Sequence, residues 1–383
     1  MNIFFAAPRV HPNQTPIIEG LIKKGHNVFC LVQRQGEYEK HGDACVFTLK
    51  SLPICKFFTK IIRKIKGEDY AERKGIYYFI PSIIELIGIF KKHRPDIIVA
   101  RDRTLFSLMI VRIGKKYTDK IILYNQTAEY EEVGGAKYVN PTLKKVVSSF
   151  FPKKRMTVVE YKNYPSLNKE YKKDDNATFI PFVVRNINNA KDEYCKDNVV
   201  HIFDSGKYRD YKNHFFVVDL AKKLKNDKYS NFIVTIQGQV TNTEEQNYYD
   251  KLQKYIIDND VSDKVRLLKG VPYEDMEKLF LDYDIFILAS KSEVANISIL
   301  DAMMYGLLTI STSANGTASY IVPNVTGQVY ESNNIESLCN IIEYYLDNNL
   351  EIEKIGKYAH EYAKDKFSFD NYYKQFMELI NKN

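Results

Sequence analysis

Short apolar runs alternate with helical patterns along most of this 383-residue chain. Strands that alternate with helices indicate βαβ units, and therefore mostly parallel, doubly wound sheets. The runs form two series, which are NIFFAA, NVFCLV, CVFTL, DIIVA, KIILYN and RMTVVEY in the first half, then VVHIFDSG, NFIVTIQG, VRLLKG, DIFILAS and LLTIST in the second. The sequence therefore predicts an α/β protein with two Rossmann-like domains.

A polar, asparagine-rich stretch separates the two series, in ATFIPFVVRNINNAKDEYCKDN at residues 177–198. It begins with an apolar strand that contains Pro181, and the residues that follow lack the periodicity of a helix or strand, which is typical of a connection. We expect a first domain at 1–190, a second domain at 191–365 and a final helix at 366–383. That helix either stays with the second domain or crosses back to the first. With 45% hydrophobic residues, the chain is long enough to bury two cores.

Composition restricts the compartment and the partners. No stretch approaches the roughly 18 consecutive apolar residues of a membrane helix, and the first residues lack the pattern of a signal peptide. We therefore expect a cytoplasmic protein. The five cysteines are scattered without C-x-x-C spacing, so we expect reduced core residues. A net charge of only +7 and the lack of a recognisable nucleic-acid-binding motif argue against nucleic acid as a partner.

The excess of positive charge gathers in residues 54–75. Within 56–66, apolar residues recur at helical spacing against four lysines and one arginine. This is the pattern of a basic amphipathic helix, which can lie on an anionic membrane surface. It fits equally a helix that packs on a core and exposes its lysine face to solvent. Both interpretations remain open at the level of sequence.

Polar segments follow the predicted strands. Ligands of open α/β sheets bind at the carboxyl ends of the strands, so these segments are the candidate lining of a cleft between the two domains. In SGKYRDYKN, residues 205–213, Gly206 lets the backbone approach a ligand. Lys207, Arg209 and Lys212 supply cations suited to a diphosphate leaving group, although lysines on surface loops are usually only solvated.

An acid interrupts the apolar helical run in SKSEVANISILDAMMYG, residues 290–306. An ionised Asp301 among apolar neighbours is costly unless hydrogen-bond donors, such as ribose hydroxyls, satisfy it. The alternative is a first-turn acid that only stabilises the helix dipole. Asn296 or Ser298 can cap this helix, and we expect free backbone N–H groups at about 295–298 that bind a diphosphate.

Taken in order, these segments resemble the donor-binding domain of retaining GT-B glycosyltransferases of family 4. SGKYRDYKN resembles the family's G-R…K-N/G segment, and VRLLKGVPYEDMEKLFLDYDIFILAS resembles its base-binding loop with the flanking strands. SKSEVANISILDAMMYG, with the glycines that follow it, resembles the family's block of two acids separated by seven residues. The resemblance covers about residues 200–335 well and the earlier chain weakly. It implies a GT-B fold, in which two Rossmann-like doubly wound domains face each other across a cleft.

Residue by residue, the resemblance implies that Glu293 contacts hydroxyls of a donor sugar and that Asp301 holds the nucleotide ribose. Lys207 and Lys212 would bind the diphosphate, so these two lysines and Glu293 are the catalytic candidates. Two departures change reach and hydrogen-bond geometry, since Asp301 stands where the family usually has Glu, and Lys207 where it usually has Arg. The other implied donor-binding positions are Gly206, the backbone near Lys269 and Val271, which would face the base, and the amides near Ala295, Asn296 and Ile297.

The acceptor candidates follow the strands of the first half. The family often has a histidine in this domain, but no histidine lies between His93 and His201, so the catalytic detail stays open. His11 can bind an acceptor or simply belong to a turn, and Asp102 between two arginines also fits a local salt bridge. The candidates are His11, Asn13, Arg101, Asp102 and Asn125.

The activity that the resemblance implies is a metal-independent, retaining transfer of a hexose or N-acetylhexosamine from a UDP-sugar to a glycan. Combined with the basic helix, it suggests a lipid-linked acceptor at the inner membrane face, as in bacterial capsule or O-antigen assembly. Asp282 and Asp284 mimic a metal-binding D-x-D motif, but they precede their strand, at the wrong edge of a sheet, so we expect no metal and no cofactor. Two alternatives remain, a sugar-nucleotide 2-epimerase of similar architecture and a non-catalytic sugar-nucleotide-binding subunit.

Overall fold

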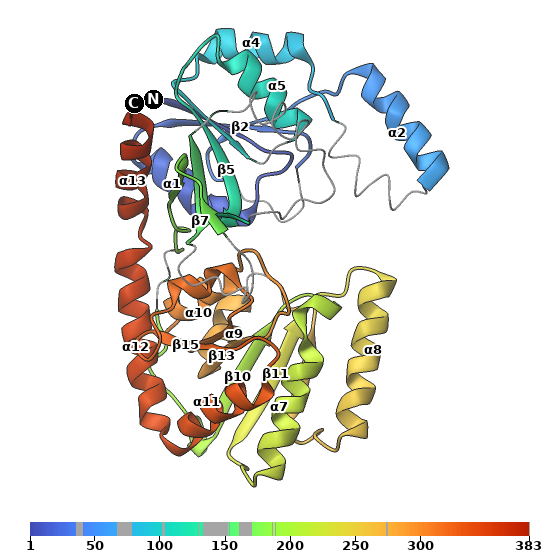
Figure 1. The fold of residues 1–383 in the computed structure, drawn as a ribbon, viewed down its shortest axis with the longest axis vertical. Helices are drawn as coiled ribbons and strands as arrows, with labels where there is room; N and C mark the ends of the chain where they lie inside the picture. Colours follow the sequence, from blue (N-terminus) through green and yellow to red (C-terminus); the bar gives the residue numbers. More distant parts are fainter. Residues whose placement is uncertain are drawn as a thin grey trace. The chain divides into compact units, whose positions relative to one another are not determined.

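The computed structural model describes residues 1–35, 41–66, 79–101, 104–128, 130–132, 152, 154–160, 171–185, 187, 189–272 and 275–382. The chain divides into two compact units. Unit 1 comprises Met1–Val158, Glu170–Val183 and Phe369–Asn383, and unit 2 comprises Val159–Lys169 and Val184–Ser368. Residues 184–190, which the sequence assigns to the first domain, thus belong to unit 2. Each unit is built on a parallel sheet with helices packed against it (Figure 1).

The main sheet of unit 1 has seven strands in the order β3-β2-β1-β4-β5-β7-β9. Its central strands are buried on both faces, which explains their continuous apolar sequences. On one face, Phe4, Leu31 and Ile98 share a core with α4 (Ile83–His93) and α5 (Leu105–Gly114). The strands are β1 Asn2–Ala6, β2 Asn27–Val32, β3 Cys45–Thr48, β4 Ile97–Arg101, β5 Ile121–Ala128, β7 Arg155–Val159 and β9 Ala177–Phe179, and β6 Tyr130–Glu132 pairs separately with β8 Tyr171–Lys173.

The last helix, α13 (Phe369–Asn381), packs in unit 1 against α1 (Thr15–Lys23). Gly20 of α1 leaves the space that the Phe369 ring fills, because a Cβ at this glycine would lie 2.2 Å from the ring. The Tyr373 hydroxyl lies 2.8 Å from His26 Nε2. The chain therefore returns to its first unit after completing the second.

Unit 2 has a six-stranded parallel sheet in the order β12-β11-β10-β13-β14-β15. One core joins the sheet to α7 (His214–Asn226), α8 (Thr243–Asp258) and α11 (Ile335–Asp347). Elsewhere, Phe280 of α9 (Met276–Leu281) contacts Phe203 and Phe286, and α12 (Asn349–Lys366) packs along α10 (Ser298–Met304). The strands are β10 Val200–Ser205, β11 Phe232–Gly238, β12 Val265–Lys269, β13 Ile285–Leu288, β14 Leu308–Thr312 and β15 Gly327–Tyr330.

Two composition-based expectations can be compared with the structure. Within the described ranges, no helix combines the length and the apolar character that crossing a bilayer requires. Cys30, Cys55 and Cys339 are buried as expected, but Cys45 is exposed, so the expectation of core cysteines is wrong there. Cys45 begins β3, the outermost strand of its sheet, which has few neighbours to cover it.

Candidate active site

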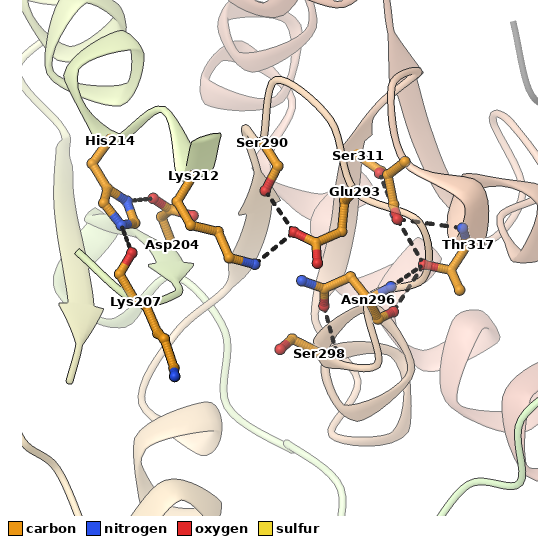
Figure 2. Close-up of polar contacts among 11 residues, drawn as sticks. Asp204, Lys207, Lys212, His214, Ser290, Glu293, Asn296, Ser298, Ser311 and Thr317 are labelled. Atoms are coloured by element: carbon orange, nitrogen blue, oxygen red, sulfur yellow. Dashed lines mark hydrogen bonds and ion pairs between the residues drawn. The ribbon is translucent and has the colours of Figure 1, made fainter. Parts of the chain in front are cut away.

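An ion pair between residues from neighbouring strand ends forms the centre of the candidate site. Lys212 closes a short 3-10 helix after β10, and Glu293 lies between the adjacent strand β13 and α10. Lys212 Nζ lies 2.7 Å from Glu293 Oε2, and the two side chains are only 9% and 18% exposed (Figure 2). Gly206 makes room for this lysine, since a Cβ there would lie 2.9 Å from Lys212 Cδ. The structure thus brings together three residues that the sequence singled out.

The backbone of Glu293 is fixed by the loop that follows β14. Its N–H donates to the Ala314 carbonyl at 3.0 Å, and its own carbonyl accepts from the Gly316 N–H at 3.1 Å. Gly316 is required for this approach, because a Cβ there would lie 2.1 Å from the Val294 carbonyl oxygen. The Ser290 hydroxyl donates to the Glu293 carboxylate at 3.3 Å. The carboxylate therefore has a defined position at the carboxyl edge of the unit 2 sheet.

The start of α10 differs from the expectation. The Asn296 N–H donates to Thr317 Oγ1 at 3.2 Å, and the Thr317 hydroxyl donates back to the Asn296 carbonyl at 2.8 Å. Asn296 Oδ1 accepts from the Ser298 N–H at 2.7 Å (Figure 2). The N-cap position is Ile297, which makes no side-chain cap hydrogen bond, so the expectation that Asn296 or Ser298 caps this helix is wrong. The prediction of free N–H groups across 295–298 is wrong for these two residues, because side chains already bind their amides. Ala295 and Ile297 are partly buried.

Asp301 lies one turn into α10, between the buried residues Leu300 and Ala302. Burial raises the pKa of the Asp301 carboxyl above the ordinary aspartate value, and the positive charge of Arg185 partly opposes this. The structure therefore contains a carboxylate whose ionised form is disfavoured by burial, as the sequence indicates. Arg185 lies in the segment that connects the units and was not foreseen.

Lys207 is exposed, and its side chain points away from the Glu293 pair (Figure 2). Across the described part of the chain, no carboxylate forms an ion pair with its amine. Its carbonyl lies 3.2 Å from His214 Nε2, while His214 Nδ1 lies 2.6 Å from Asp204 Oδ2. His214 and Asp204 are both buried, and sequence reasoning missed them. The available signal was the acid inside the apolar run VVHIFDSG, since a buried carboxylate needs a partner.

Other polar residues at this edge have structural partners. Lys269 is exposed at the end of β12, where its Nζ donates to Gln246 Oε1 at 3.3 Å, and Val271 is partly buried. Arg209 pairs with the buried Glu245 at 2.8 Å. Burial alone would raise the pKa of Glu245, but hydrogen bonds from Thr241 and Arg209 lower it overall. Arg209 therefore holds the loop in place and is not a free cation for a ligand.

The described acceptor candidates of unit 1 belong to three adjacent parallel strands. His11 and Asn13 follow β1, Arg101 is the last residue of β4, and Asn125 lies within β5, which continues to Ala128 instead of ending before it as expected. His11 is exposed, and its Nδ1 accepts from the N–H of the buried Asn13 at 3.4 Å. Arg101 donates to Gln126 Oε1 at 3.0 Å. Asn125 is partly buried, and Asp102 lies outside the described residues.

Asp284 has a structural role at the opposite edge. It is buried before β13, where its carboxylate accepts from the N–H groups of Cys195 and His201 at 2.9 and 2.8 Å. Lys191 Nζ lies 3.2 Å from it. Within the described ranges, no group of three or more His, Cys, Asp or Glu is arranged to hold a metal ion.

Two Rossmann-like units, each with polar residues at the carboxyl edge of its sheet, define the GT-B class of glycosyltransferase folds. Residues 184–362, which include most of unit 2, match the family described as glycosyl transferases group 1. The amylovoran biosynthesis glycosyltransferase AmsK of Erwinia amylovora is 23% identical over 138 residues, which cover 34% of this chain and 34% of that protein. The match thus spans about a third of this relative's length.

Two solved structures show the same fold over 99% of the chain. The HepE protein of Anabaena, solved in complex with UDP and glucose, has a TM-score of 0.69 and 13% identity, with 99% of this chain and 98% of that chain covered. The lipopolysaccharide outer core galactosyltransferase WaaB has a TM-score of 0.67 and 14% identity, with 99% of both chains covered. At these identities the likeness establishes the fold alone.

Proposed function

We propose that the protein is a retaining, metal-independent glycosyltransferase that moves a hexose or N-acetylhexosamine from a UDP-sugar to a glycan acceptor. The observation that carries this proposal is the Lys212–Glu293 pair at the carboxyl edge of a glycosyl transferases group 1 domain. The nucleotide sugar is a co-substrate, and no other cofactor is part of the proposal. The UDP found in the complex of the Anabaena protein supports the choice of donor.

Each candidate residue at the carboxyl edge of the unit 2 sheet would bind a different part of the donor. The Asp301 carboxylate accepts hydrogen bonds from the ribose hydroxyls, which would offset the burial that raises its pKa. Lys207 and Lys212 neutralise the diphosphate, and Glu293 accepts hydrogen bonds from the sugar hydroxyls. When a diphosphate binds and attracts Lys212, the lysine would lose part of its pairing with Glu293 and contact the donor instead.

In the proposed reaction the bond between the sugar C1 and the diphosphate oxygen breaks, and a bond from C1 to the acceptor oxygen forms on the same face. The acceptor hydroxyl gives its proton to the departing phosphate oxygen, so the products are a glycoside and UDP. No carboxylate base is needed for this balance. The protein contributes positioning and stabilisation of the developing negative charge on the leaving group.

The first experiment screens UDP-, GDP- and ADP-sugars for hydrolysis and for transfer to glycan acceptors. Glu293→Gln keeps the side-chain size but removes the charge that faces Lys212, so we expect kcat/KM to fall about 100-fold, or roughly 3 kcal/mol of transition-state stabilisation. Glu244→Gln, at an exposed acid in the first turn of α8, is the matched control and should be unchanged. Wild-type kinetics in Glu293→Gln would refute the site assignment.

The same screen separates the two alternatives. An epimerase would convert the nucleotide sugar into its epimer without an acceptor, whereas a non-catalytic subunit would bind nucleotide sugars and turn over none of them. Transfer with retention of configuration at C1, read by NMR of the product, supports the proposal. An acceptor-independent epimer, or binding without any turnover, contradicts it.

We also propose that α2 (Pro53–Lys66) contacts the membrane and that the acceptor is lipid-linked, in bacterial surface polysaccharide biosynthesis at the cytoplasmic face. Phe57, Ile61 and Ile65 recur every four residues, on one stripe of the helix, and are 62%, 37% and 70% exposed. The charged residues Lys60, Arg63 and Lys64 are also exposed. Exposed apolar and basic side chains on one helix suit the surface of an anionic bilayer. The polysaccharide pathway is supported by the names of the relatives, which act in amylovoran biosynthesis and on the lipopolysaccharide outer core.

Flotation with vesicles tests the membrane contact. We expect wild-type protein to float with vesicles that contain about a third anionic phosphatidylglycerol, and to stay behind when Lys60, Arg63 and Lys64 are all replaced by Glu. Phe57→Ser with Ile65→Ser should also lose flotation, whereas Ile257→Ser, at an exposed isoleucine of α8 in unit 2, should retain it. Equal flotation of the wild type and both α2 variants, or no flotation of the wild type, would rule the contact out.

A further inference from the structure

The carboxyl end of α10 is fully hydrogen-bonded. Within the helix and its terminal turn, the N–H groups of Tyr305, Gly306 and Leu307 donate to carbonyls of the last turn at 3.0 Å each. The carbonyls of Met304, Tyr305 and Gly306 come next in the chain, beyond the reach of the helix's own N–H groups. An α-helix of only seven residues has little intrinsic stability, so the partners of these three carbonyls decide how firmly α10 is held.

All three carbonyls are bound by groups from other segments. His360 Nδ1 of α12 contacts the Met304 carbonyl, and because a carbonyl only accepts, Nδ1 is the donor in this contact. The Lys191 N–H donates to the Tyr305 carbonyl at 2.9 Å. The Tyr194 hydroxyl donates to the Gly306 carbonyl at 2.7 Å.

These partners are themselves anchored. Lys191 Nζ donates to the Leu281 carbonyl at 3.0 Å and lies 3.2 Å from Asp284, and the Cys195 N–H donates to the same carboxylate. The Lys191 ammonium also lies 5.2 Å from the centre of the Tyr194 ring. Lys191 and Cys195, which flank Tyr194 in the chain, are therefore both bound to Asp284 at the start of β13. These contacts hold the tyrosine in place.

Helix α12 contacts the end of α10 through its backbone. A Cβ at Gly356 would lie 2.1 Å from the Gly306 carbonyl oxygen, and a Cβ at Gly306 would lie 2.9 Å from the Tyr194 hydroxyl. Gly306 has a φ of +85°, a conformation that other residues rarely adopt. His360 lies one turn beyond Gly356 on α12, so it reaches the same end of α10.

We propose that Tyr194 and His360 are positioning residues that hold Asp301 at the place where it binds the ribose of a nucleoside diphosphate. The inference rests on the proposed function. Asp301 lies one turn before the bound carbonyls, so a shift of that helix end moves the carboxylate directly. Small displacements of a binding group weaken recognition strongly, because hydrogen bonds tolerate little change in distance and angle.

The test compares hydrogen-bonding and non-bonding side chains at the two positions. Tyr194→Phe removes only the hydroxyl, and His360→Leu removes the donor. His360→Asn retains an amide nitrogen near the position of Nδ1, which makes it the rescue variant. Tyr358→Phe, at an exposed tyrosine of α12, is the matched control. The readouts are UDP binding by calorimetry, KM and kcat for the donor sugar that the wild type turns over, and Tm.

We expect Tyr194→Phe and His360→Leu to raise the Kd for UDP and the donor KM about 3- to 10-fold with little change in kcat, in the range expected for one lost hydrogen bond. His360→Asn should lie within about twofold of the wild type, and Tyr358→Phe should be unchanged. Wild-type UDP affinity in both variants, or a lower Tm without a change in Kd, would overturn the positioning role alone. A wild type that neither binds UDP nor transfers a sugar would instead overturn the proposed function itself.

Discussion

At the scale of single residues, two acids of unit 2 respond to burial in opposite ways. Hydrogen bonds from Thr241 and Arg209 outweigh burial at Glu245 and lower its pKa. At Asp301, burial prevails and raises the pKa, with only the charge of Arg185 to oppose it. An acid whose pKa is raised by burial at a strand-edge site is typical of a ligand-binding group, whereas Glu245 has a structural role.

The raised pKa of Asp301 predicts that Asp301→Asn stabilises the fold. The native state holds the proton more tightly than the unfolded state, so burial of the charge lowers the free energy of unfolding once the pH exceeds the ordinary aspartate value. We expect a gain in Tm of a few degrees at pH 7, since about 1 kcal/mol shifts Tm by roughly 2–4 °C in units of this size. The gain should shrink as the pH falls toward the ordinary aspartate range, and UDP binding should weaken.

Thermal unfolding from about pH 3.5 to about pH 8, a range that reaches the ordinary aspartate value, provides the measurement. Asp282→Asn, at an exposed aspartate of the same unit, should show no comparable gain and serves as the control. A lower Tm for Asp301→Asn at pH 7, or a difference that does not vary with pH, would contradict the prediction.

At the scale of elements, glycines occur at the carboxyl ends of three adjacent strands, β10, β11 and β12. Gly238 ends β11, and a Cβ there would lie 2.3 Å from the Gly206 carbonyl oxygen and 2.9 Å from the Tyr208 ring. The Gly238 carbonyl accepts from the Gly270 N–H at 3.0 Å. The absence of side chains lets these strand ends approach each other, and it brings the loop with Lys207 and Lys212 to the sheet edge.

Gly238→Ala should therefore destabilise unit 2 by about 1–3 kcal/mol, because the nearest atom is a backbone oxygen that cannot rotate away. Gly88→Ala in α4 is the contrasting substitution, since nothing lies within 4 Å of the added methyl. It should stabilise unit 1 by about 0.5–1 kcal/mol through helix propensity. Urea denaturation gives both values, and equal effects of the two substitutions would show that the close approach at Gly238 does not constrain the fold.

At the scale of the whole molecule, the chain order and the spatial units differ. Unit 1 contains the last helix, α13, although the whole of α7–α12 intervenes between it and the first unit. Tyr372 and Phe376 of α13 are buried, and the Tyr372 hydroxyl lies 3.9 Å from Met156 Sδ of β7. The stability of unit 1 therefore depends on residues synthesised after unit 2 is complete.

Phe376→Ala should cost about 3–5 kcal/mol, as expected for a buried phenylalanine, and the loss should fall on unit 1. Hydrogen exchange should become faster in α1 and β7 but remain unchanged in α7 and α8. Phe286→Ala, at an equally buried phenylalanine of β13, is the reciprocal control, with faster exchange confined to unit 2. If Phe376→Ala accelerated exchange equally in both units, α13 could not be assigned to the first.

Sequence alone located most strands and three residues of the candidate site that lie together. Each long apolar run corresponds to an observed strand, because strands buried on both faces require continuous apolar sequence. The strands β6, β8 and β15 were not predicted, since they have only three or four residues and lack such runs. Gly206, Lys212 and Glu293 were chosen for their chemistry and their places after strands, and they do lie together.

What sequence by itself determined is the order of the elements, the two sheets and the chemical character of each strand end, since these follow from local periodicity and residue type. Tertiary structure alone decided which groups meet. Thr317, 21 residues further along the chain, binds the backbone amide of Asn296, which sequence reasoning left free. Similarly, the buried His214 side chain pairs with the buried Asp204 carboxylate. Likewise, only packing shows that Phe369–Asn383 belongs to unit 1. Such pairings depend on how neighbouring strands and helices align in space, and no local pattern in the chain encodes the distance between the two partners.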